Sequence, residues 1–174
     1  MPDPTRIEIT AVAQVVAGHA EPGDDFQGGV ESTIRMNENF QLDTLAGLGD
    51  FSHLEVLWHF HRASPTDVAL HARSPRNNPD WPATGTFTHR NHRRPNQLAV
   101  SHPRLVRVDG RDLHVTDFDA VVGTPIFDVS PYFPVMGPRG EIHVPNWVNE
   151  MLGRYWDNPH EKPESASRGK PCGV

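Results

Sequence analysis

Apolar and polar residues alternate along two segments of the chain. From Val30 to Asn37 every second side chain is apolar or small, and the same period returns from Leu54 to His61. A period of two places successive side chains on opposite faces of a strand, so each segment predicts a strand with one buried face. In the second segment the pair His59 and His61 lies on the face opposite the large apolar residues.

Shorter runs predict further strands. The runs 104–108 and 113–118 flank Asp109-Gly110, a strong signal for a tight hairpin turn, and the run 125–129 predicts another strand. The 17 prolines and 14 glycines separate these runs at fairly regular spacing. Such punctuation is typical of antiparallel β-proteins, so we expect a mostly β fold, a small antiparallel β-barrel or a sandwich, rather than alternating strands and helices.

One helix is predicted near the C-terminus. Trp147, Met151 and Tyr155 recur at a spacing of four between about Asn146 and Trp156, after a proline suited to a first helical turn. Residues 157–174 are rich in Pro, Ser, Gly and charged side chains, so we expect a flexible tail there unless a partner holds it. The expected organisation is therefore one β-barrel domain over residues 1–156, with a short C-terminal helix, followed by the tail 157–174.

Length and composition narrow the class of protein. A chain of 174 residues buries enough surface to fold without a metal or a disulfide. The single cysteine, Cys172, lies in the tail and argues against a disulfide framework and a cysteine-based zinc site. No apolar run approaches the roughly 18 residues that span a bilayer, and the first residues lack the apolar segment of a secretory signal. We therefore expect a soluble, cytoplasmic protein without membrane association.

A cationic segment stands out against the formal net charge of −6. No Asp or Glu occurs between Asp80 and Asp109, and five arginines fall in this interval: Arg90, Arg93, Arg94, Arg104 and Arg107. If these side chains converge, their field favours an anionic ligand, because an Arg fork binds a carboxylate or phosphate with two parallel hydrogen bonds. The alternative is a solvated face of the protein.

Histidines offer a second candidate chemistry. His59 and His61 share one strand face with His53 nearby, and a cupin-like metal oxygenase uses such a pair. That site also needs a glutamate soon after the second histidine and a third histidine on a later strand, yet Asp67 is the only nearby acid. We favour histidines that are exposed or hydrogen-bonded in a ligand pocket, and we expect no metal.

Other enzyme signatures are missing from the sequence. There is no G-x-S-x-G elbow, and neither a Walker A motif nor a G-x-G-x-x-G run follows a strand. Two acids, Asp119 and Asp128, flank a Gly-Thr-Pro turn, where they either cap backbone N–H groups or hold a donor pair such as ribose hydroxyls. The glycine-rich loop from Glu21 to Gly29 suits a hairpin connection or a lid.

Three motifs, in order along the chain, carry a family resemblance. They are Gly47-Leu48-Gly49-Asp50-Phe51-Ser52-His53-Leu54, then Gly85-x-Phe87-x-x-Arg90-x-x-x-Arg94-Pro95-Asn96-x-x-x-x-Ser101, then Gly123-Thr124-Pro125-x-x-Asp128-x-x-Pro131-Tyr132. In order and spacing they resemble the signatures of the TsaA-like, or TrmO-like, proteins over roughly residues 7–135. The resemblance implies a small β-barrel methyltransferase that uses S-adenosyl-L-methionine, works as a homodimer and N-methylates threonylcarbamoyladenosine in the tRNA anticodon loop.

The resemblance also implies the residues of the site. For cofactor binding it assigns Phe26, Gln27, Gly28, His61, Arg62, Arg90, Val100, Thr116, Asp117, Phe118 and Asp119. The adenine suits an aromatic ring such as Phe26 or Phe118, the ribose hydroxyls suit Asp119, and the methionine carboxylate suits an Arg fork. The substrate-binding candidates are Arg93, Arg94, Asn96 and Arg104. The candidates for a general base are His61 and Asp128, with water as the alternative proton acceptor.

Departures from the family pattern leave the methyl acceptor open. Gln97 and Ala99 replace the proline and glycine usual in the family's Arg-Pro-Asn-Pro-x-Gly run, and Val122 stands where an acid is common. A tRNA methyltransferase is the leading interpretation. A small-molecule methyltransferase of the same fold and a non-catalytic regulator that binds S-adenosyl-L-methionine are the alternatives.

Overall fold

The computed structural model describes residues 5–160, which form one sheet and one short α-helix, α1 (Asn146–Leu152). The strands are β1 (Ala13–Ala17), β2 (Ser32–Met36), β3 (Leu54–His59), β4 (Leu98–Ser101), β5 (Arg104–Asp109), β6 (Asp112–Thr116) and β7 (Pro125–Pro131). No helix within this described part is long and apolar enough to cross a membrane.

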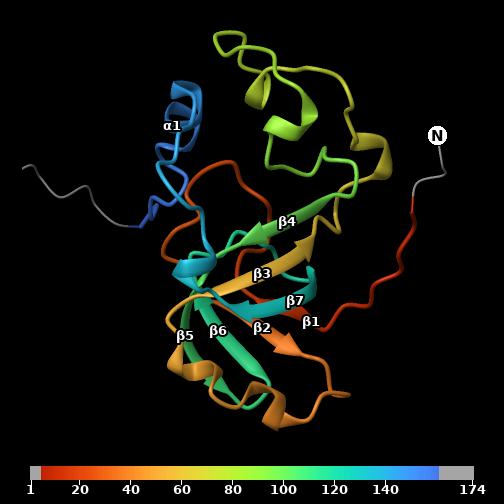
Figure 1. The fold of residues 1–174 in the computed structure, drawn as a ribbon, viewed down its shortest axis with the longest axis vertical. Coiled ribbons are helices and arrows are strands. Elements are labelled where there is room, and N and C mark those ends of the chain that lie inside the picture. Colours follow the sequence, from red (N-terminus) through yellow and green to blue (C-terminus); the bar gives the residue numbers. More distant parts are fainter. Residues whose placement is uncertain (1–4, 161–174) are drawn as a thin grey trace, which may run out of the picture.

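The seven strands form one antiparallel sheet in the order β4-β3-β7-β1-β2-β6-β5 (Figure 1). β5 and β6 are joined by a tight hairpin in which Asp109 is paired with Asp112. Gly110 occupies the turn with a φ of 56°, a conformation that glycine adopts at little cost. The hairpin predicted from Asp109-Gly110 is therefore confirmed.

The expected barrel is wrong, because the sheet is open and has β4 and β5 as its edges. Register shifts in the β1–β2, β3–β7 and β5–β6 pairs introduce bends, and the two ends of the sheet meet at one corner. There His53 forms an isolated bridge with Arg104, and the Leu54 N–H donates to the Pro103 carbonyl at 3.0 Å. Pro103 has no N–H with which to extend a ladder, so the contact stays local.

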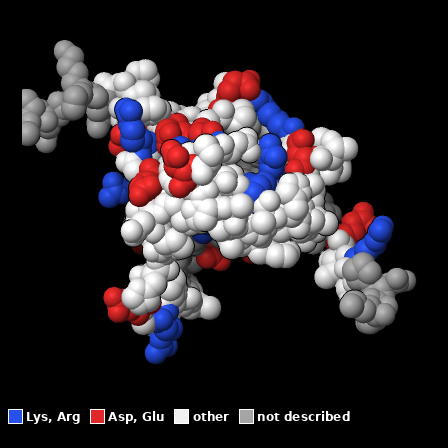
Figure 2. Space-filling view, turned by 90° about the horizontal axis from the view of Figure 1, so that it is seen from above, with Lys and Arg blue, Asp and Glu red and all other residues white. Residues whose placement is uncertain are grey.

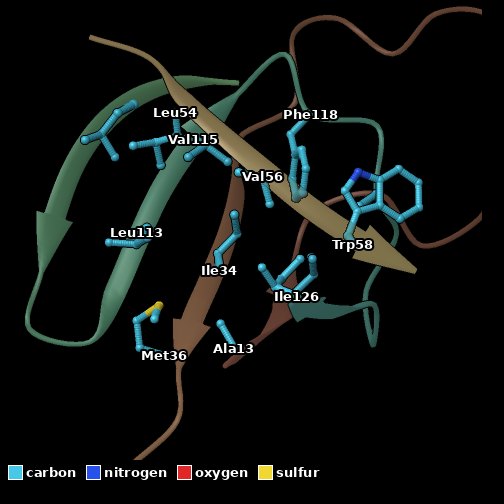
Figure 3. Packing of buried hydrophobic residues seen from close by; sticks show 13 residues of the cluster. Ala13, Ile34, Met36, Leu54, Val56, Trp58, Leu113, Val115, Phe118 and Ile126 are labelled. Atoms are coloured by element: carbon cyan, nitrogen blue, oxygen red, sulfur yellow. The ribbon is translucent and has the colours of Figure 1, made fainter. Parts of the chain in front are cut away.

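The core lies on the inner face of the bent sheet (Figure 3). Its buried side chains come from every strand except β4, whose half-buried Ala99 packs against it. Ile34, Leu54, Leu113 and Ile126 are each 0% exposed. Burial of one such side chain contributes about 1.5–3 kcal/mol. Along β2 and β3 buried and accessible positions alternate as the sequence predicts, apart from the buried Thr33.

Five of the seven strands fall on predicted segments, whereas β1 and β4 were not predicted. α1 ends at Leu152 rather than near Trp156, because Gly153, a poor helix former, is followed by a turn in which the Tyr155 N–H donates to the Leu152 carbonyl at 3.0 Å. The first tail residues follow this turn. The rest of the predicted tail, 161–174 with Cys172, lies outside the described residues.

A long segment, residues 60–97, joins β3 to its neighbour β4. It lies over the end of the sheet where β3 ends and β4 begins, beside α1 (Figure 1). Its two ends are joined by the buried Gln97, whose Nε2 donates to the Ser64 carbonyl at 2.9 Å. The segment is also tied to α1, because Trp81 Nε1 donates to Glu150 Oε2 at 2.9 Å. These contacts fix the loops around the C-terminal end of β3.

Candidate functional site

A pocket of about 200 Å³ lies at the C-terminal end of β3. Its wall is formed by Pro22, Trp58, Phe60, His61, Arg62, Ala63, Asp67, His92, Asp119, Val121 and Thr124. Apolar walls with a few polar groups are typical of small-molecule sites. The volume is below the roughly 300 Å³ at which ligand pockets begin, so a ligand of nucleotide size would extend over neighbouring exposed side chains.

Two hydroxyl groups hold the Asp119 carboxylate at this pocket. Ser101 Oγ donates to Oδ1 and the Tyr155 hydroxyl donates to Oδ2, each at 2.7 Å. Ser101 Oγ in turn accepts a hydrogen bond from Trp58 Nε1 at 3.0 Å. Burial and the nearby Asp119 charge raise the pKa of Tyr155, so its hydroxyl remains a donor. Each carboxylate oxygen keeps a lone pair with which it can accept a further bond.

His61 is the titratable ring at the pocket. Its Nδ1 lies 3.2 Å from Thr124 Oγ1, and a Cβ on Gly123 would lie 3.2 Å from its Nε2. Burial, followed by the charges of Arg62 and His59, lowers the pKa of His61 from its ordinary value of 6.5. A neutral imidazole at pH 7 leaves one ring nitrogen able to accept a proton.

Two predicted cofactor residues meet beside the pocket, where Arg90 Nη2 donates to the Val100 carbonyl at 2.6 Å. Arg90 is exposed and keeps further N–H donors for a ligand. Arg62, a third predicted cofactor residue, forms a salt bridge with Glu21, in which Arg62 Nη1 lies 2.8 Å from Glu21 Oε2. This pair links the end of β3 to the loop between β1 and β2.

The predicted cofactor loop around Phe26 is paired with the segment that follows α1. The Phe26 N–H donates to the Arg154 carbonyl at 3.1 Å, and the Gln27 N–H donates to the Tyr155 carbonyl at 2.7 Å. Gln27 and Gly28 are buried, while Phe26 is exposed over 36% of its surface. The loop is therefore held against the C-terminal segment, whose Tyr155 reaches Asp119 in the pocket wall.

Several predicted residues do not reach the pocket. The Phe118 ring is 0% exposed and packs edge-on against Trp58, so the expectation that adenine stacks on it is wrong. Asp128 lies on the exposed side of β7 and is not part of the pocket wall, which leaves His61 as the general-base candidate there. Thr116 ends β6 and the exposed Asp117 follows it, both outside the wall.

The predicted arginines do not converge. Arg93, Arg94 and Asn96 lie in the segment between β3 and β4, near His92 in the pocket wall. Arg104 begins β5 at the opposite end of β3, where its backbone forms the corner of the sheet.

Other basic groups are paired with acids, as in Arg35–Asp112, Arg76–Asp25 and Arg107–Glu31. Figure 2 accordingly shows acidic and basic side chains interspersed over the face seen from above. A single continuous cationic surface, which the arginine count suggested, is therefore not present on that face.

The histidines do not assemble a metal centre in the described part of the chain. Among residues 5–160, no group of three or more His, Cys, Asp or Glu side chains could hold a metal ion. His59 packs near the Phe127 ring, with 6.2 Å between centroids, and His53 contacts Ser52. The cupin-like alternative therefore lacks its ligands there.

Sequence reasoning missed several residues of the site. Trp58 was assigned to the core by its alternation, but it ends the buried row and also forms the pocket wall. Tyr155 was assigned to a helix face and instead lies past the helix end, against Asp119. Thr124 was read only as part of a turn. A signal existed for Thr124, since it belongs to the third motif.

A bent antiparallel sheet with a ligand pocket at a strand end defines a class of β-proteins distinct from parallel nucleotide-binding folds. The sequence profile of the tRNA-methyltransferase O N-terminal domain matches residues 23–137. The chain belongs to this family. A solved structure of TrmO from Pseudomonas aeruginosa has a TM-score of 0.65 at 21% identity, covers 82% of this chain and is itself covered over 62%. At that identity the likeness shows the fold alone.

Curated relatives carry names that concern S-adenosylmethionine or tRNA. A probable S-adenosyl-L-methionine-binding protein of Pyrococcus abyssi is 29% identical over 123 residues, covering 71% of this chain and 63% of that protein. The human tRNA (adenine(37)-N6)-methyltransferase is 30% identical over 62% of this chain and 27% of its own length. The Escherichia coli protein of that name is 35% identical over 54% and 41%. The chain thus spans less than two thirds of the length of these relatives.

Proposed function

We propose that this chain is an S-adenosyl-L-methionine-dependent methyltransferase that N-methylates threonylcarbamoyladenosine in the tRNA anticodon loop. The observation that carries the proposal is the pocket at the end of β3, where the adjacent residues His61 and Arg62 meet Asp119 from a distant part of the chain. Membership of the family and the tRNA (adenine(37)-N6)-methyltransferases among its relatives support the reaction and the acceptor.

The donors and acceptors of the pocket suit this cofactor. Asp119 offers free lone pairs to a pair of ribose hydroxyls, and the Phe60 and His92 rings, 6.2 Å apart, provide aromatic surface for a base. The exposed Arg90 can bind a carboxylate with two parallel hydrogen bonds. When bound, S-adenosyl-L-methionine supplies a methyl group activated by a positively charged sulfonium. The arginines would lie away from that charge, since like charges repel.

The residues of the chain have two tasks in methyl transfer, which are alignment and removal of a proton. Alignment of the acceptor nitrogen with the methyl carbon needs rigid walls, and orientation of this kind supplies several kcal/mol. The acceptor nitrogen loses its proton as the new N–C bond forms and the S–C bond breaks. His61 takes that proton, because its lowered pKa keeps the ring neutral at pH 7.

Mass spectrometry of nucleosides tests the proposal directly. The full chain is incubated with S-adenosyl-L-methionine and tRNA that carries unmethylated threonylcarbamoyladenosine, and we expect the methylated nucleoside to accumulate. An unchanged nucleoside, in the presence of bound cofactor, would exclude this acceptor.

Two arginines provide a matched pair for the same tRNA. Arg93 lies near the pocket, in the segment between β3 and β4. Arg93→Ala should reduce the slope of log affinity against log salt by about one, the value for one lost phosphate contact. Arg104→Ala removes the same charge at the opposite end of β3 and should leave the slope unchanged. Equal slopes for the two variants would contradict an acceptor surface beside the pocket.

A small-molecule methyltransferase is the second candidate. It is favoured by the net charge of −6 and by the interspersed charges in Figure 2, because a large polyanion binds best to a continuous cationic surface. Release of S-adenosylhomocysteine with a metabolite pool, and not with tRNA, would support it. Binding of S-adenosyl-L-methionine without formation of S-adenosylhomocysteine from any acceptor would support a regulator instead. The homodimer implied by the resemblance stays a prediction, which sedimentation analysis can test.

A further inference from the structure

The segment Arg154–Asn158, which follows α1, lies beyond the residues matched by the family profile, 23–137. It nevertheless contacts the loop that the resemblance assigns to the cofactor. Two backbone hydrogen bonds join them, from the Phe26 and Gln27 N–H groups to the Arg154 and Tyr155 carbonyls. This contact brings a chain segment from outside the matched region to the edge of the pocket.

Glycines make this close approach possible. A Cβ on Gly28 would overlap the Trp156 carbonyl oxygen, and a Cβ on Gly29 would overlap the Asn158 side chain. The Arg154 guanidinium lies over the Phe26 ring, with its carbon 4.4 Å from the centroid. Backbone pairing, glycine contacts and the cation over the ring together fix the position of the segment.

Tyr155 carries this segment to the pocket. Its hydroxyl donates to Asp119 Oδ2 at 2.7 Å across 36 residues of sequence, opposite the Ser101 donor on Oδ1. A phenylalanine would provide the same ring packing. The hydroxyl is therefore the part of Tyr155 that is specific to the contact with the carboxylate. With one donor on each oxygen, the carboxylate is prevented from rotating and its remaining lone pairs have fixed directions.

We propose that Tyr155 is a positioning residue of the cofactor site, whose hydroxyl orients the Asp119 carboxylate toward the two hydroxyls of the cofactor ribose. The inference rests on the proposed function, since it takes the nucleoside part of S-adenosyl-L-methionine as the ligand of Asp119. It adds that the segment after α1 is a part of the site and that this contact determines selectivity for a ribose diol.

Tyr155→Phe in the full chain tests the proposal by calorimetry with S-adenosylhomocysteine. We expect binding about tenfold weaker, as for a charged hydrogen bond worth about 1.4 kcal/mol. Tyr132→Phe is the matched control. It removes the hydroxyl of the chain's other tyrosine, which lies beside His102 at the far end of β3. Its affinity should stay within about twofold of the wild type.

A ligand without the diol separates positioning from folding. For the 2′,3′-dideoxy analogue of S-adenosylhomocysteine, Tyr155→Phe should weaken binding by less than about twofold, since the groups that Asp119 would bind are gone. An equal loss for both ligands would show a general structural role and overturn the proposal. In an Asp119→Asn background, Tyr155→Phe should likewise have little further effect, and additive losses would contradict a role through Asp119.

The outcomes distinguish this inference from the proposed function. Wild-type protein that does not bind S-adenosylhomocysteine would overturn both. Wild-type binding with unchanged affinity in Tyr155→Phe would overturn the role of Tyr155 alone. Cofactor binding with the expected loss, but without methylation of any tRNA, would leave the role of Tyr155 intact and overturn the proposed acceptor.

Discussion

The sheet and the segments around the pocket are stabilised in different ways. The sheet combines backbone ladders between neighbouring strands with an apolar core drawn from six strands. The pocket segments are residues 18–31, 60–97 and 153–160. They are joined by separate polar contacts, such as the Arg62–Glu21 salt bridge and the hydrogen bond from the Gln27 N–H to the Tyr155 carbonyl. Loss of one core side chain is shared by the whole sheet, whereas loss of one polar contact is local. We therefore expect substitutions at these polar contacts to act on the pocket more than on the sheet.

A core substitution should have the largest effect on this comparison. Leu113→Ala removes a side chain that is 0% exposed in β6 and should lower the free energy of unfolding by about 2–5 kcal/mol. Val106→Ala, at a position 47% exposed in the neighbouring β5, should change it by less than about 0.5 kcal/mol. Denaturant unfolding followed by fluorescence measures both. A loss below about 1 kcal/mol in Leu113→Ala would contradict a core that stabilises the sheet cooperatively.

A glycine substitution should have a smaller and local effect. Gly28→Ala would force the Trp156 backbone away, and we expect a cost of about 1–3 kcal/mol confined to the contact between the loop 18–31 and the C-terminal segment. Faster hydrogen exchange of the Gln27 amide, which is bonded to the Tyr155 carbonyl, reports that opening.

Gly85→Ala is the matched control for Gly28→Ala, since a Cβ there meets nothing within 4 Å and the backbone has an extended conformation. Exchange at Gln27 should be unchanged in this variant. Faster exchange throughout the sheet in Gly28→Ala would contradict the independence of the two regions.

The difference between the regions also explains what the sequence could predict. Alternation predicted β2 and β3 because one face of each is buried against the core. β1 escaped prediction because its apolar residues are adjacent rather than alternating, and β4 because it has only 4 residues inside an arginine-rich run. The barrel was wrong because closure depends on how distant strands meet at Pro103, which no local pattern records.

The pocket was predictable only in part. His61, Arg62 and Asp119 came from motif resemblance, and the structure brings them into one wall. Tyr155 could not be predicted, because its contact with Asp119 depends on where α1 ends and on a fold that joins residues 36 positions apart. The arginines failed as a group for a related reason, since a charge count along the sequence says nothing about which strand ends receive them.

The smallest expected effect concerns the pocket and is the pH dependence of the proposed methyl transfer. Because burial and neighbouring positive charges lower the pKa of His61 below 6.5, most of the folded protein keeps this ring neutral at pH 6.5. The rate there should lie less than about twofold below its value at pH 8, and the acid limb should have its midpoint below pH 6.5. Steady-state rates between pH 5.5 and about 8 measure this, and in His61→Gln the acid limb should disappear. A midpoint above 6.5 would contradict the lowered pKa of the His61 ring, and an acid limb unchanged in His61→Gln would exclude His61 as the proton acceptor.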